Sequence, residues 1–91
     1  MRLDLFLSKS RLLKSRSVAK QACEGGRVSV GEHMAKASKE VSEGDLLTLS
    51  FLNRTLEVEI VKLPWKNMKR SEAVNTYRIL SEQRENPFSL A

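Results

Sequence analysis

The spacing of the apolar residues changes at Gly25-Gly26. Before this pair, as in residues 3–7, apolar side chains recur at intervals of three and four, which is typical of an amphipathic helix. After the pair, as in residues 47–51, they alternate with polar side chains, which is typical of half-buried strands. Such a chain is restricted to a fold in which short helices precede an antiparallel sheet.

Two helices are predicted, over residues 2–8 and 16–24. Ser15 is a good N-cap for the second helix, because its hydroxyl can accept a hydrogen bond from a free backbone N–H group. Gly25-Gly26 should end that helix, since glycine adopts the left-handed conformation at little cost. The two helices should pack through apolar side chains, which are Leu3, Phe6, Leu7, Leu12, Val18 and Ala22.

Four strands are predicted near residues 28–30, 34–36, 47–51 and 56–60. Turns are expected at Gly31-Glu32, at residues 43–45 and at Asn53-Arg54. The predicted fold class is α+β, with two short helices packed on one side of a small, twisted antiparallel sheet.

The last third of the chain is less regular. Residues 63–66 form an irregular link, Ser71 could cap a helical turn, and residues 77–80 suit either continued helix or a last strand, of which a strand after a short helix is favoured. Asn86-Pro87 should end any regular structure. We therefore expect one domain over residues 1–62 and a C-terminal extension over 63–91 that packs on it or trails from it.

Basic charge is concentrated at the beginning of the chain. Of the 91 residues, the first 39 hold nine basic and three acidic side chains, whereas the rest hold seven and eight, and the net charge is +5. A local basic patch of this kind captures polyanions. A solvated basic face that only aids solubility is the alternative.

Catalytic and cofactor motifs are not found in the sequence. The thiol of Cys23 falls on an apolar stripe and should be packed, His33 falls beside a turn, and Glu57 and Glu59 should lie on a solvated sheet face. The glycines lack the Lys-Ser/Thr signature of a phosphate-binding loop. We expect no enzyme activity, no metal and no cofactor.

A lone cysteine and the lack of an apolar run of about 20 residues favour a cytoplasmic protein without membrane association.

The candidate site is a set of six basic residues on the two predicted helices and their connector. If the helices pack as an L, these side chains form one basic surface suited to phosphate groups. The predicted RNA-binding residues are Arg2, Lys9, Arg11, Lys14, Arg16 and Lys20.

Several short motifs resemble the domain named after ribosomal small-subunit protein four (the S-four domain). They are Arg2-Leu3-Asp4, Phe6-Leu7, Arg11-Leu12, Ser15-Arg16, Ala19, Gly26-Arg27-Val28, Val30 and Gly44-Asp45, within residues 1 to about 51. The resemblance implies an α-L RNA-binding motif, in which two helices form an L against a small twisted sheet.

The tail extends the resemblance to one stand-alone branch, through Glu72-Ala73, Asn75, Tyr77 and Ile79-Leu80. The chain is similar to the RqcP family of bacterial ribosome-associated quality control. This implies binding to ribosomal RNA and peptidyl-tRNA on the obstructed large ribosomal subunit, and support of poly-alanine tailing with the partner RqcH. It also implies RNA contacts by Arg2 and Arg16, and by Arg11, Lys14 and Lys20. We expect a monomer. Gly31-Glu32 departs from the family's usual Asn-Gly and would put a negative charge near the RNA.

Three alternatives remain open. A heat-shock relative that rescues dissociated large subunits usually has a longer basic tail, whereas residues 87–91 here are neutral. The domain also occurs in RNA-modifying enzymes, for which 91 residues leave no room for a catalytic domain. A protein adaptor is the third, because Phe51 and Trp65 lack an assigned partner, although Trp65 is expected to pack against the sheet.

Overall fold

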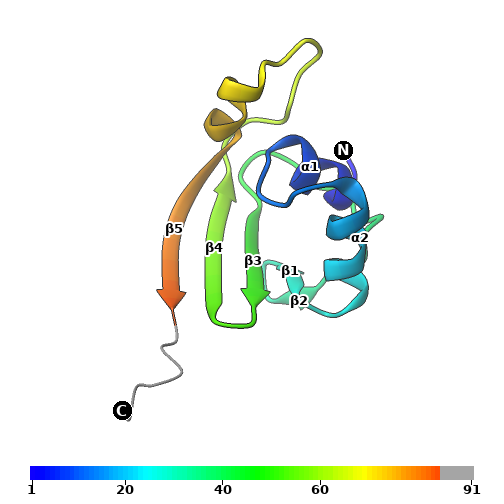
Figure 1. Cartoon of the computed structure of the whole chain (residues 1–91), viewed down its shortest axis with the longest axis vertical. Coiled ribbons are helices and arrows are strands. Elements are labelled where there is room, and N and C mark those ends of the chain that lie inside the picture. The colour runs from blue at the N-terminus through cyan, green and yellow to red at the C-terminus, as the bar shows by residue number, and fades with distance from the viewer. Residues whose placement is uncertain (85–91) are drawn as a thin grey trace.

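The computed structural model describes residues 1–84 (Figure 1). The expected end of regular structure at Asn86-Pro87 and the neutral segment 87–91 lie outside the described residues.

The first two elements are the predicted helices, α1 (Leu3–Lys9) and α2 (Arg16–Glu24). The Ser15 side chain caps α2, because its Oγ accepts a hydrogen bond of 3.2 Å from the backbone N–H of Val18. At the other end Gly26 has a φ of 71°, and Arg27 N–H donates to Ala22 O at 3.0 Å. This is the paired hydrogen bonding of a Schellman motif, which needs a residue that tolerates positive φ.

One antiparallel sheet follows, with the strand order β2-β1-β3-β4-β5. Its first four strands are β1 (Val28–Val30), β2 (His33–Met34), β3 (Leu46–Phe51) and β4 (Arg54–Ile60). Gly31, with a φ of 63°, begins the two-residue turn between β1 and β2, as glycine can at the first position of such a turn. Strand β2 is shorter than residues 34–36 and begins one residue earlier, because its register is set by pairing Val30 with His33.

The C-terminal part adds a 3-10 helix, η1 (Arg70–Thr76), and a fifth strand, β5 (Tyr77–Arg84). The helical turn does not begin at Ser71 as expected. Its N-cap is Lys69, whose backbone N–H donates to Glu72 Oε1 at 3.1 Å. Strand β5 pairs with β4 and so completes the same sheet that the first part of the chain begins.

The helices cover one face of the sheet, and the core lies between them (Figure 1). Its largest fully buried side chains include Leu3, Phe6, Leu7, Leu47, Leu49 and Ile60. The fold is therefore α+β with two short helices on a small antiparallel sheet, as the sequence predicts.

Two packing expectations were wrong. Val18 is 38% exposed, whereas Ala19 and Cys23 are the buried residues of α2. Trp65 is half-buried and outside the core cluster, and Lys62 Nζ lies 4.7 Å from the centre of its ring.

Over the described residues, no helix has the length and apolarity to cross a membrane.

Candidate RNA-binding surface

All six predicted RNA-binding side chains are exposed. Arg2 precedes α1, Lys9 ends it, Arg11 and Lys14 lie in the connector, and α2 carries Arg16 and Lys20. The structure does not join them into one uniform face. It pairs Arg2 with Arg16 and distributes most of the others between two grooves.

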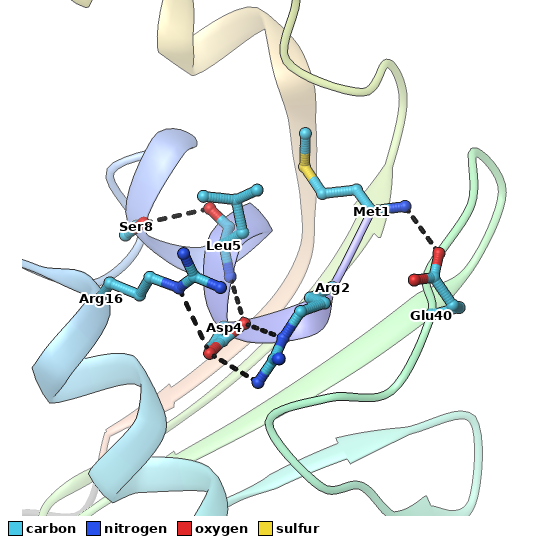
Figure 2. A network of polar contacts seen from close by, with 7 residues as sticks. All are labelled: Met1, Arg2, Asp4, Leu5, Ser8, Arg16 and Glu40. Atoms are coloured by element: carbon cyan, nitrogen blue, oxygen red, sulfur yellow. Dashed lines mark hydrogen bonds and ion pairs between the residues drawn. The ribbon is translucent and has the colours of Figure 1, made fainter.

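The pair is organised by a buried carboxylate, that of Asp4 (Figure 2). Arg2 Nε is 3.2 Å from Asp4 Oδ1, and Arg2 Nη2 is 3.3 Å from Oδ2. Arg16 Nε is 3.4 Å from the same Oδ2. The side chain of Asp4 is 3% exposed, whereas those of Arg2 and Arg16 are 45% and 52% exposed. One buried anion thus holds two half-exposed guanidinium groups.

The backbone fixes Asp4 in this position. Its N–H donates to Ala37 O at 3.1 Å, and the N–H of Leu3 donates to Lys39 O at 2.8 Å, so the start of α1 is tied to the loop before β3. Burial alone would raise the pKa of Asp4. Hydrogen bonds from Arg2 and from the Leu5 N–H, with the charges of both arginines, outweigh burial and lower this pKa below its ordinary value of 3.8. The carboxylate is therefore charged at neutral pH.

This arrangement leaves arginine nitrogens facing solvent. Among the described residues, Arg16 uses only Nε toward Asp4, so its terminal nitrogens keep their hydrogen-bonding capacity for another group. A guanidinium held by one carboxylate can present its remaining N–H groups to a phosphate with little loss of side-chain freedom. The geometry therefore suits recognition of an anion at the junction of α1 and α2.

The first groove lies beside this junction. Arg2 and Lys20 line it together with Lys36, while Cys23 and Glu24 contribute to the same lining. Sequence reasoning missed Lys36, which comes from the loop after β2 and reaches the helices only through the fold. Glu24 is the acidic side chain of this groove, so the three cations outnumber it.

The connector is held by specific hydrogen bonds although it has no regular secondary structure. Ser10 is fully buried, and its Oγ bonds to Leu7 O at 3.3 Å. Arg11 has a φ of 68°, an unusual value for a residue other than glycine, and its N–H donates to Ser8 O at 3.1 Å. Arg11 and Lys14 line a second groove, apart from the one that holds Arg2 and Lys20. Lys9 lines neither.

The acidic side chains considered from the sequence lie elsewhere. Glu32 and Glu57 line a hollow on the sheet, away from both basic grooves. Glu59 Oε1 forms an ion pair of 2.8 Å with Arg78. Glu32 therefore adds no negative charge to the lining of either basic groove, and the effect of the Gly31-Glu32 turn on RNA contacts stays a prediction.

Groups of catalytic or metal-binding type are not gathered in the described part of the chain. No cluster of three or more His, Cys, Asp or Glu residues could hold a metal ion there. His33 is exposed. Burial, with smaller contributions from the charges of Asp4 and Glu24, raises the pKa of the Cys23 thiol, which makes it a poor nucleophile.

Asp4 is the residue of the candidate site that reasoning from charge overlooked. A signal was present, because Asp4 precedes the buried Leu7 by three residues and so lies on the core side of α1. A buried acidic residue needs a cationic partner, and Arg2 is adjacent. Its second partner, Arg16, is twelve residues away and follows only from the packing of α1 on α2.

Comparison with known proteins shows the family of this chain. Residues 1–47 match the family model described as "S4 domain". The chain is 43% identical over 84 residues to the RQC P-site tRNA stabilizing factor of Bacillus subtilis, covering 92% of this chain and 96% of that protein. It is 36% identical over 78 residues to a heat shock protein 15 homolog of Haemophilus influenzae, covering 86% of this chain and 60% of that protein.

Two solved structures share the fold. Heat shock protein 15 of Vibrio cholerae, described as trimeric, superposes with a TM-score of 0.77 and 34% identity, covering 87% of this chain and 80% of that chain. A hypothetical protein solved in solution, HP1423, superposes with a TM-score of 0.75 and 35% identity, covering 89% and 98%. The buried Asp4 with its two arginines thus lies inside the matched S4 domain, and the chain belongs to the S4 domain family and, within it, to the RqcP family of RQC P-site tRNA stabilizing factors.

Proposed function

We propose that this protein is an RNA-binding factor of ribosome-associated quality control, which acts by binding and not by catalysis. The observation that carries the proposal is the Asp4 network, in which a buried carboxylate orients Arg2 and Arg16 toward solvent. Its RNA-binding residues would be Arg2, Lys9, Arg11, Lys14, Arg16 and Lys20. The name of the relatives, RQC P-site tRNA stabilizing factor, supports tRNA as a ligand.

The proposal also covers the RNA partners of the protein, its cellular location, its oligomeric state and its protein partner. The protein would bind large-subunit ribosomal RNA and peptidyl-tRNA in the cytoplasm, as a monomer, and would support poly-alanine tailing of stalled chains together with RqcH. Residues 1–62 would form the RNA-binding domain and 63–91 its extension. The pairing of β5 with β4 supports an extension that packs on the domain.

A second function is favoured by one specific observation, the structural likeness to heat shock protein 15. A protein of that kind would bind large subunits that have dissociated. The two functions differ in whether the bound subunit carries peptidyl-tRNA. The P-site factors favour the first function, because the Bacillus subtilis factor is 43% identical and 96% covered, against 36% and 60% for the heat shock protein 15 homolog.

The test is to isolate ribosomal particles on a tagged copy of the protein from cells with stalled translation. Enrichment of large subunits that hold peptidyl-tRNA over free large subunits is expected. Equal recovery of both would favour the heat-shock function, and recovery of neither would refute the proposal. Arg16→Gln should reduce recovery. Arg78→Gln, which removes an exposed arginine of β5, is the matched control and should not.

A further inference from the structure

The second groove joins two parts of the chain that are far apart in sequence. The connector contributes Ser10, Arg11 and Lys14, and the C-terminal part contributes Arg70, Val74 and Tyr77. Figure 1 shows that η1 lies at the same end of the sheet as α1, which brings the two segments together. The C-terminal residues of this groove lie beyond residues 1–47, the part that matches the S4 domain.

The charge of this groove is not neutralised within the described residues. Arg11, Lys14 and Arg70 are exposed, and none of them forms an ion pair with a residue among 1–84. The acidic residue of η1, Glu72, is not part of the groove lining and accepts a hydrogen bond from the Lys69 N–H. Three cations thus border one hollow without an acidic side chain in its lining.

The walls between the cations are partly apolar. Val74 is 60% exposed, and the half-buried Tyr77 contributes an aromatic ring. A polynucleotide offers phosphates for the cations and riboses or bases for the apolar surface. Two arginines add planar donor groups that match phosphate oxygens.

We propose that the Arg11–Lys14–Arg70 groove is a second RNA-binding site, which takes the sugar-phosphate backbone of an RNA segment. The inference rests on the proposed RNA-binding function and extends it, because Arg70 and Tyr77 lie outside the S4 domain match. The C-terminal part then completes a binding groove, in addition to extending the sheet.

Arg70→Gln tests the site, with Arg78→Gln as its matched control. Each variant removes one exposed arginine from the C-terminal part, but Arg78 is paired with Glu59 and is not part of the groove lining. The probe is a purified large ribosomal subunit, and its affinity for each protein is measured at several salt concentrations. Arg70→Gln should weaken binding about tenfold, a loss typical of one charge-assisted hydrogen bond. It should also reduce the slope of log affinity against log salt by about 0.7–0.9. Arg78→Gln should change affinity less than twofold.

A second variant tests the groove independently, in case Arg70→Gln does not fold. Arg11→Asn removes a groove cation with a residue that tolerates the positive φ at this position, and it should reproduce the loss seen with Arg70→Gln. Thermal unfolding of each variant checks that the fold is retained. If the wild type binds and both groove variants match Arg78→Gln, the second site is wrong while RNA binding stands. If poly-glutamate competes for the groove and RNA does not, an acidic protein segment is the ligand. If the wild type does not bind, the proposed function itself fails.

Discussion

Asp4 Oδ2 lies 3.4 Å from Arg16 Nε and so links the first turn of α1 to the first turn of α2. Because Asp4 is buried and also bonded to Arg2, this contact belongs to the fold as much as to the binding surface. Substitutions at the two arginines should therefore affect both stability and binding, and the two effects can be separated by measurement.

Asp4→Asn should lower the free energy of unfolding at pH 7 by about 2 kcal/mol, because the buried group loses its charged hydrogen bonds. The pKa of Asp4 is lowered by folding, so its stabilisation is present above 3.8 and is lost as the pH falls through the folded-state value. The difference between wild type and variant should therefore shrink below pH 3.8. Urea unfolding at several pH values measures it. A difference that grew with acidity would contradict the assigned direction. The lowered pKa of Glu40 is common to both proteins and cancels in the comparison.

Arg2→Gln and Arg16→Gln should each weaken binding to large subunits about tenfold and lower the salt slope by about 0.7–0.9. Each single variant leaves Asp4 one arginine, so each should destabilise the fold by only about 1 kcal/mol. The double variant leaves a buried carboxylate without a cation and should lose about 3 kcal/mol or more, which exceeds the sum. Urea unfolding of the three variants checks this. Strict additivity would mean that Asp4 does not couple the two arginines.

Trp65→Ala should lower the free energy of unfolding by less than about 1 kcal/mol, because the ring lies outside the core cluster and its described partner is the cation of Lys62. Leu47→Ala is the reference, since Leu47 is fully buried and should cost about 2–5 kcal/mol. Thermal unfolding compares the two. An equal loss for Trp65→Ala would restore the packing against the sheet that the sequence predicts for this ring.

Cys23 should react slowly with iodoacetamide at pH 8 in the folded protein. Its thiol is buried and its pKa is raised, first by burial and then by the charges of Asp4 and Glu24, so little thiolate is present and access is poor. In urea the same thiol should react at the rate of a free cysteine. Mass spectrometry of timed samples measures both rates. Equal rates would show that Cys23 is an accessible thiol and would reopen a chemical role for it.

The sequence by itself determined the elements that depend on local contacts. Ser15 caps α2 through a hydrogen bond to a residue three positions away, and Gly26 ends that helix within one turn. The alternation in β3 and β4 likewise follows from neighbouring residues, because every second side chain must face the core. The order of periods on either side of Gly25-Gly26 was therefore enough to predict the α+β class, and the cluster of basic residues indicates where the candidate RNA surface begins.

Only the tertiary structure decided which charges meet. Asp4 reaches Arg16 because α1 packs on α2, Lys36 joins Arg2 and Lys20 because a loop folds back on the helices, and η1 brings Arg70 beside the connector. The exposed position of Val18 depends on the same long-range packing. Charged side chains on the surface follow no period of their own, and their partners are set by distance in space, which the packing of the apolar core determines.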